Sequence, residues 1–337
     1  MISQVNRKKS PQLKVNMRSY KPTFDKNLVN LLLVFICSAF LYLTIFSMGN
    51  FSAPDRINYY NFFSNSEDSR FEPGFVLFAQ LTNFLNMNSE QSLLVVAGLI
   101  FLFAFLTITN YFSKAPVKVF IVLSFLLLAI SSIYSFAQIR GALAIWSGLL
   151  IYNFYQRENK IAYIFLLTLT CSIHLLMIFF VGIVIAQRIF SMRFMLLAGS
   201  LGLFILYNFY AQIIETLGLN PYYLEYFEGS LVNNLFYSPF LLLYFFIMIF
   251  IMIFRKESII KINPIIWLGL PPLFFAYLTG IDLIVKFAAP LMIYTWIVFF
   301  KLLFSIDRWS WFQPLVYIGL FSSLPLVIFY PFIKYVF

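Results

Sequence analysis

Apolar runs, each close in length to a membrane-spanning helix, follow one another along almost the whole chain. A helix needs about 20 predominantly apolar residues to cross the hydrocarbon core of a bilayer. So much apolar surface can be buried only against lipid, so the sequence predicts an all-α, polytopic transmembrane helical bundle. The runs stand at 28–48, 92–112, 117–137, 141–155, 161–187, 194–210, 236–254, 264–281, 285–304 and 311–331.

Composition leaves little room for a separate soluble domain. Charged residues make up 11% of the 337 residues, whereas soluble domains carry about a quarter. We therefore expect a basic cytoplasmic tail at 1–27 and a single multi-pass transmembrane domain at 28–337. The polar stretches at about 49–91 and 211–235 are predicted to be its outer loops.

The placement of basic residues predicts the topology, because cytoplasmic loops are enriched in Lys and Arg. The basic tail before the first run places the N-terminus in the cytoplasm. If 73–87 dips into the outer interface, and if 161–187 is a hairpin of two short helices, most later basic loops are also cytoplasmic. This arrangement has about eleven spans, within a range of about ten to twelve. A single crossing by 161–187 would instead place the later basic loops outside.

This topology gathers polar residues at one face of the membrane. Arg140, His174 and Lys286 all fall at outer ends of helices, beside the two outer loops. A charged residue at membrane depth is costly and usually indicates a partner or a water-filled cavity. We therefore expect a cavity that opens to the periplasmic face.

Other classes of site find no support in the sequence. The net charge of +10 comes from basic residues in ones and twos between apolar runs, which does not predict a nucleic-acid surface. Cys37 and Cys171 lie within apolar runs and are interpreted as small buried hydrophobic residues. With no Cys/His cluster and no Gly-rich phosphate loop, we expect neither a metal site nor a cofactor.

Three residues are candidates for catalysis, and each has a simpler interpretation. Arg140 suits an anion clamp, because guanidinium binds phosphate in a bidentate manner, or it is an interfacial arginine. His174, the single histidine, would accept a proton from a sugar hydroxyl if neutral, or it is a packed core residue. Lys286 would contact a diphosphate, with Asp282 orienting it, or the two form an ion pair four residues apart.

The first outer loop combines acids, arginines and tyrosines that suit a carbohydrate ligand. Sugar faces stack on aromatic rings and sugar hydroxyls need acceptors, although aromatic residues also gather at membrane interfaces. The candidate substrate-binding residues are Asp55, Arg56, Tyr59, Tyr60, Arg70 and Glu72, together with Gln138 and Asp282 elsewhere in the chain.

Three segments carry a resemblance to a known family. They are Asp55 to Phe75, in which a D-x-x-x-Y-Y segment precedes E-P-G-F; Gln138 to Ala144 followed by Ser172-Ile173-His174; and Asp282 to Phe287. The chain resembles the O-antigen and exopolysaccharide polymerases of the Wzy/EpsG type. Lys286 stands where the family commonly has arginine, and Leu175 follows His174 where a small hydroxyl residue is often found.

The resemblance implies a glycosyltransferase-type polymerase at the outer face of the bacterial inner membrane. Its substrate would be an oligosaccharide repeat unit linked to undecaprenyl diphosphate, and the product would be O-antigen, capsule or exopolysaccharide. Arg140 and Lys286 would stabilise the departing diphosphate, and His174 would be the base for the acceptor hydroxyl. A chain-length regulator and a flippase are the protein partners that it suggests, and nucleic acid is not one.

Two other classes of protein remain as alternatives. A flippase or other transporter is expected to show repeat symmetry between its halves, and no internal repeat is evident. Another membrane glycosyltransferase, or an O-antigen ligase, would share the substrate and is not distinguished by charge arguments.

Overall fold

The computed structural model describes the part of the chain that contains most of the predicted site. The described residues are 35–39, 42, 54–64, 71–112, 139–155, 160–187, 189–216, 268, 271, 278, 289–291, 293–295, 297 and 298.

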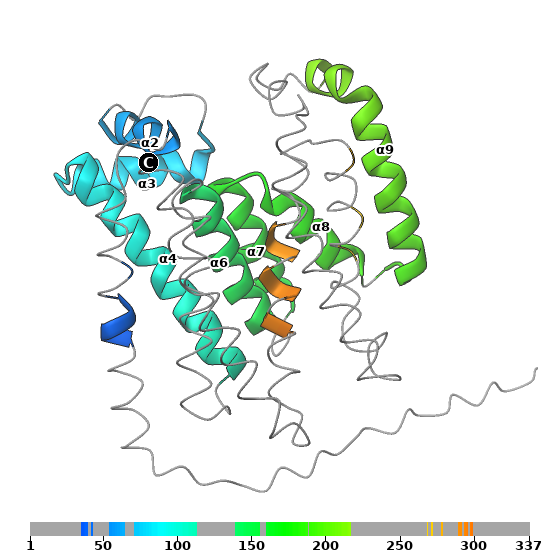
Figure 1. The fold of residues 1–337 in the computed structure, drawn as a ribbon, viewed down its shortest axis with the longest axis horizontal. Coiled ribbons are helices and arrows are strands. Elements are labelled where there is room, and N and C mark those ends of the chain that lie inside the picture. The colour runs from blue at the N-terminus through cyan, green and yellow to red at the C-terminus, as the bar shows by residue number, and fades with distance from the viewer. Residues whose placement is uncertain are drawn as a thin grey trace, which may run out of the picture.

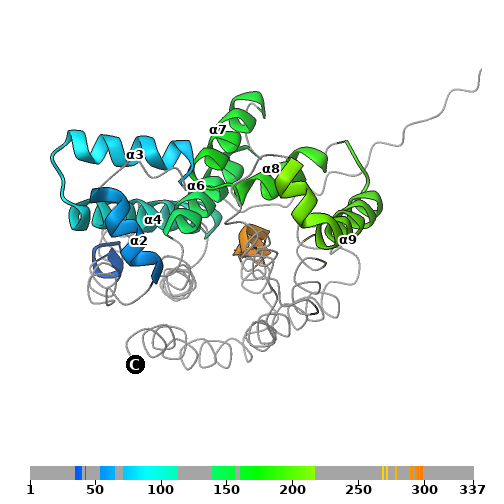
Figure 2. The same cartoon turned by 90° about the horizontal axis from the view of Figure 1, so that it is seen from above.

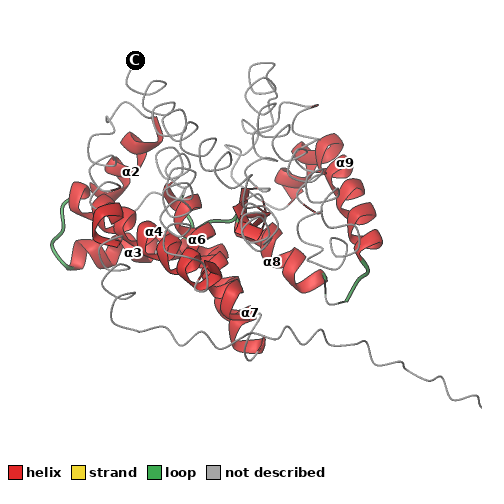
Figure 3. Ribbon diagram, turned by 60° about the horizontal axis from the view of Figure 1, so that its bottom comes forward, coloured by secondary structure: helices red, strands yellow, loops and turns green. Residues whose placement is uncertain are grey.

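Every regular element within those residues is a helix (Figure 3), as the sequence predicted. One of these helices, Ser89–Tyr111 with 23 residues, is long and apolar enough to cross a membrane. The span count, and the side of the membrane at which each end lies, stay predictions. The helices are α2 (Pro54–Ser64), α3 (Pro73–Phe84), α4 (Ser89–Phe112), α6 (Ile139–Tyr155), α7 (Lys160–Ile173), α8 (Met177–Ala186) and α9 (Met192–Thr216).

Helix α6 lies at the centre of the described bundle. Viewed from above, it runs between α4 on one side and α7 and α8 on the other (Figure 2). Residues 141–149 are all buried, so this stretch of the helix has no face turned to the surroundings, and exposure begins only near its end, at Phe154. A helix that is apolar on every side is stable only when other helices enclose it. The short run predicted at 141–155 is therefore the core helix, and it fixes the position of Arg140 at its start.

A tight turn joins α3 to α4. Asn86, with a φ of 56°, adopts the left-handed conformation that asparagine tolerates. The amides of Asn86 and Met87 bond back to the carbonyls of Asn83 and Thr82, which closes the end of α3 as a Schellman motif. Asn88 and Gln91 then exchange reciprocal side chain to backbone bonds, a capping box that begins α4. The turn holds α3 at one end of α4, and α2, which packs on both helices, lies at the same end (Figure 1).

The run 161–187 consists of two helices, α7 and α8, which confirms the prediction that it is not one long helix. At about 21 Å and 15 Å, both are shorter than the hydrocarbon core of about 30 Å. Helix α3, at about 18 Å, is also too short to cross, as expected for the segment 73–87. The orientation of these helices in the membrane stays a prediction.

One helix was not predicted, and one boundary and one cysteine differ from the predictions. A helix, α2, occupies part of the predicted outer loop 49–91, because Pro54 starts a helix well and α2 buries Tyr59, Phe62 and Phe63 on one face. Helix α9 continues to Thr216, beyond the predicted end of its run at 210. The interpretation of Cys37 as a buried residue is wrong, because its side chain is exposed.

Large apolar side chains are exposed along α4, α7 and α9. Ile161 is 81% exposed, Leu197 is 71% exposed and Phe165 is 65% exposed. A soluble monomer rarely exposes apolar patches of this kind, whereas a membrane protein turns them toward lipid. The outer faces of these helices therefore have the character of a lipid-facing surface.

Candidate functional site

A charged cluster forms where three separate parts of the chain meet. Glu72 immediately precedes α3, Arg140 lies in the first turn of α6, and His174 lies between α7 and α8. Because α3 contacts α7, and α6 packs along α7, the three side chains converge at the end of the bundle where α2 and α3 lie (Figure 1). We call Tyr59, Glu72, Arg140 and His174 the Glu72 cluster.

The Arg140 guanidinium is held on three sides. Its Nη1 donates to Glu72 Oε2 in an ion pair, and its Nε donates to the hydroxyl of buried Tyr59 at 3.2 Å. The guanidinium carbon lies 4.4 Å from the centre of the Phe71 ring, which is a cation–π contact. These contacts fix both the position and the plane of the guanidinium, so Arg140 is not a loosely held interfacial arginine.

The second carboxylate oxygen of Glu72 contacts the residues between α7 and α8. Glu72 Oε1 lies 2.8 Å from His174 Nδ1, and it accepts the backbone N–H of Leu175 at 3.2 Å. A helix break within an apolar run leaves backbone groups without helical partners, and Glu72 supplies an acceptor for one of them. An ionised carboxylate only accepts, so Nδ1 carries the hydrogen and a neutral imidazole has its lone pair on Nε2.

The E-P-G-F sequence explains how Glu72 reaches these partners. Pro73 occupies the first turn of α3, where its missing N–H has no cost. Gly74 lies against the end of α7, where a Cβ would come 2.8 Å from the carbonyl oxygen of Ser172. Phe75 is fully buried among other aromatic rings, including Phe62 at 5.6 Å between centroids. Each residue of the motif therefore either places Glu72 or anchors the helix that follows it.

The carboxyl of Glu72 lies outside the predicted spans and is ionised. Partial burial alone would raise its pKa, but the hydrogen bond from His174, the charge that His174 carries when protonated, and the charge of Arg140 outweigh burial and lower the pKa from 4.5 to about 2. Side-chain exposures are 12% for Glu72, 18% for Arg140 and 17% for His174, so the cluster is shielded but can still be reached.

The structure unites four of the predicted site residues, the members of the Glu72 cluster. Tyr60 is exposed on α2, and α2 also includes Asp55 and Arg56 in its first turn. Predicted residues that lie outside the described part of the chain are Arg70, Gln138, Asp282 and Lys286.

Two contributors to the cluster were not predicted from the sequence. They are the Phe71 ring under Arg140 and the close approach of Gly74 to Ser172. Their signal was present, because both flank Glu72 in R-F-E-P-G-F. Glu72 was expected to bind substrate, but its carboxylate contacts Arg140 and His174. Among the described residues, no group of three or more His, Cys, Asp or Glu side chains could hold a metal ion.

Comparison with known protein families decides what kind of protein this is. The family model for the EpsG family matches residues 33–336, which is nearly the whole chain. The chain belongs to the EpsG family. EpsG-family proteins are polymerases of the Wzy/EpsG type, so this is a membrane protein of polysaccharide biosynthesis. No curated protein and no solved structure matches it.

Membership in the EpsG family covers all three segments of the sequence resemblance, since each lies within 33–336. Two of those segments, around Glu72 and from Arg140 to His174, contribute side chains to one cluster. The carboxylate of Glu72 thus joins residues that lie 68 and 102 positions further along this EpsG-family chain.

Proposed function

We propose that this protein joins oligosaccharide repeat units carried on undecaprenyl diphosphate into a polysaccharide, and that the reaction takes place at the Glu72 cluster. The observation that carries the proposal is the shared carboxylate of Glu72, which holds a cation and an imidazole side by side. A diphosphate leaving group needs a cation, and an acceptor hydroxyl needs a base. The cluster offers one of each within a partly shielded site.

Arg140 keeps donors for a diphosphate while it is held by the protein. A guanidinium has five N–H groups. In the part of the chain that the structure describes, Glu72 and Tyr59 use one each. The remaining donors suit phosphate oxygens, and α6 begins at Ile139, so the positive end of its helix dipole lies beside Arg140.

His174 is oriented to act as the base. Its Nδ1 hydrogen is directed to Glu72, so Nε2 is the ring atom that would accept the proton of the acceptor hydroxyl. The hydroxyl oxygen then forms a bond to the anomeric carbon of the donor sugar. The bond from that carbon to the diphosphate oxygen breaks, and the diphosphate leaves with the electron pair. Glu72 stabilises the imidazolium, and Arg140 stabilises the departing charge.

The donor and acceptor are both lipid-linked, and the reaction is placed at the outer face of the bacterial inner membrane. The exposed apolar faces of α4, α7 and α9 and the family membership support a bilayer setting. The residues of the Glu72 cluster do not determine which sugars are joined, so the polymer is O-antigen, capsule or exopolysaccharide. A chain-length regulator and a flippase are its proposed protein partners.

The decisive experiment measures polymer length in cells that express Arg140→Ala at the wild-type membrane level. Loss of one preorganised charge contact should slow the transfer about a hundredfold or more. Lipid-linked single repeat units should then accumulate, because their synthesis and export precede polymerisation. A normal ladder of chain lengths would refute the proposal. Single units that accumulate only inside the cell would instead favour a transporter.

A further inference from the structure

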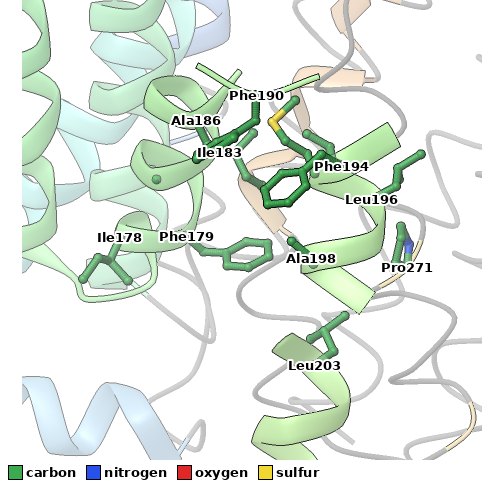
Figure 4. A pocket seen from close by; sticks show the side chains of 14 residues that line it. Ile178, Phe179, Ile183, Ala186, Phe190, Phe194, Leu196, Ala198, Leu203 and Pro271 are labelled. Carbon is green, nitrogen blue, oxygen red and sulfur yellow. The ribbon is translucent and has the colours of Figure 1, made fainter. Parts of the chain in front are cut away.

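An apolar groove lies between α8 and α9, beyond the Glu72 cluster. It encloses about 400 Å³, and every side chain that lines it is apolar. Figure 4 shows Ile178, Phe179 and Ile183 of α8 and Phe194, Ala198 and Leu203 of α9 around the same space. The volume is within the range of about 300–1,000 Å³ that is usual for ligand pockets.

Small residues open this groove on both sides. A Cβ added to Gly182 of α8, or to Gly199 of α9, would meet no atom within 4 Å. Phe190 and Phe194 stack with their centroids 4.8 Å apart and form part of the wall. An apolar slot between flat aromatic rings and glycines fits a flexible, unsaturated hydrocarbon chain better than a compact ligand.

The position of the groove connects it to the charged cluster. Ile178, at one end of the lining, follows His174 by four residues, and α8 begins in between at Met177. The lining continues along α8 to Ala186, a length of about 12 Å. This approaches the depth of one leaflet of hydrocarbon, about 15 Å. A ligand with its charged head at Arg140 would therefore have its apolar tail beside α8.

We propose that this groove binds the first part of the undecaprenyl chain of the lipid-linked substrate, an inference that rests on the proposed function. The groove orients the substrate by holding the chain nearest the diphosphate, while the rest of the chain stays in the bilayer. One feature separates this occupant from an ordinary phospholipid. The groove begins at Ile178, four residues after His174 of a cluster suited to a diphosphate.

The test measures binding of three probes to the purified full-length protein by native mass spectrometry. The probes are undecaprenyl diphosphate, dimethylallyl diphosphate, which has the same head and one prenyl unit, and dioleoylphosphatidylglycerol. Gly199→Leu fills the groove. Gly202→Leu is the matched control on α9, because Gly202 also has open space around it but does not line the groove.

Gly199→Leu should weaken undecaprenyl diphosphate binding about tenfold, as expected if leucine displaces about two methylene groups of the chain. It should leave the affinity for dimethylallyl diphosphate unchanged, which also shows that the variant is folded. Gly182→Leu, from the opposite wall, should repeat this result. Gly202→Leu should bind both diphosphates as the wild type does.

Two results would overturn the inference. One is equal binding of undecaprenyl diphosphate by the Gly199→Leu and Gly202→Leu proteins. The other is that the wild-type protein binds dioleoylphosphatidylglycerol as tightly as undecaprenyl diphosphate, and that Gly199→Leu weakens the binding of both lipids to the same extent. Failure of the proposed function looks different, since Arg140→Ala would then leave the binding of both diphosphates unchanged. A wild-type protein that binds neither diphosphate would contradict both proposals.

Discussion

Replacing Glu72 with glutamine should remove most of the activity while leaving the protein in the membrane. Glutamine keeps the shape of the side chain and an oxygen for the Leu175 amide, but it loses the charge that faces Arg140 and His174. The lowered pKa of Glu72, from 4.5 to about 2, corresponds to about 3 kcal/mol of stabilisation of the ionised carboxylate.

The loss should appear mainly in the rate of transfer. If Glu72 stabilises the imidazolium of His174 in the transition state, up to about 3 kcal/mol of its effect is realised there, and the rate falls by about a hundredfold. The assay is the initial rate of chain elongation in membranes with matched protein levels. Glu90→Gln is the control, because it makes the same change at an exposed residue in the first turn of α4.

A double variant separates positioning from structure. If Glu72 acts through His174, combining Glu72→Gln with His174→Ala should cost little more than His174→Ala alone. Independent losses that add would show that Glu72 only supports the fold or Arg140. An elongation rate for Glu72→Gln equal to that of Glu90→Gln would refute the whole reasoning about the shared carboxylate.

The remaining predictions test His174 as the base, the packing of Gly74, the role of Lys286, and the loss at low pH of the stability that Glu72 contributes. His174→Gln, which can hydrogen-bond but is a poor base, should lower the elongation rate by about a hundred- to ten-thousandfold, and a near-wild-type rate would exclude proton transfer by His174. Gly74→Ala should lower both activity and melting temperature, because its Cβ meets the Ser172 backbone, whereas Gly98→Ala on α4, which has open space, should leave both unchanged or slightly raise stability. Lys286→Arg should retain substantial activity while Lys286→Ala loses it, and equal near-wild-type rates would make Lys286 an ion-pair partner of Asp282. The stability that ionised Glu72 contributes is complete above pH 4.5 and is lost as the pH falls toward about 2, so the difference in melting temperature between wild type and Glu72→Gln should narrow only within that range.

Much of the local structure was predictable because it depends on neighbouring residues. Apolar runs of nearly membrane-spanning length predicted α4, α6 and α9. The placement of basic residues favoured two short helices over one in the run 161–187, which has His174 near its middle. Helix α2 was not predicted, because its sequence is polar enough for a loop and its buried face depends on contacts with later residues. Burial of Phe62 against Phe71 and Phe75 is such a contact.

The residues of the site were predictable in part, but their pairing was not. Charges and a histidine within apolar sequence indicated Arg140 and His174, since such residues are costly there. The partner of both, Glu72, stands 68 residues before one and 102 before the other, and no spacing rule connects them. The sequence placed Glu72 among carbohydrate ligands, whereas only the packing of α3 against α7 shows that it joins the two catalytic candidates.

The shortness of α7 and α8 has a consequence for how the Glu72 cluster can assemble during synthesis. Neither helix crosses the hydrocarbon core alone, so a ribosome-bound chain ending at Ile173 would leave α7 without a stable place in the bilayer. Glu72 and Arg140 leave the ribosome before His174, so their ion pair can form first. When the segment between α7 and α8 follows, Glu72 can then accept the backbone N–H of Leu175. Insertion of α7 and α8 as a pair would then complete the Glu72 cluster, and charge loss at Glu72 should slow membrane integration of this pair in a translation arrest assay.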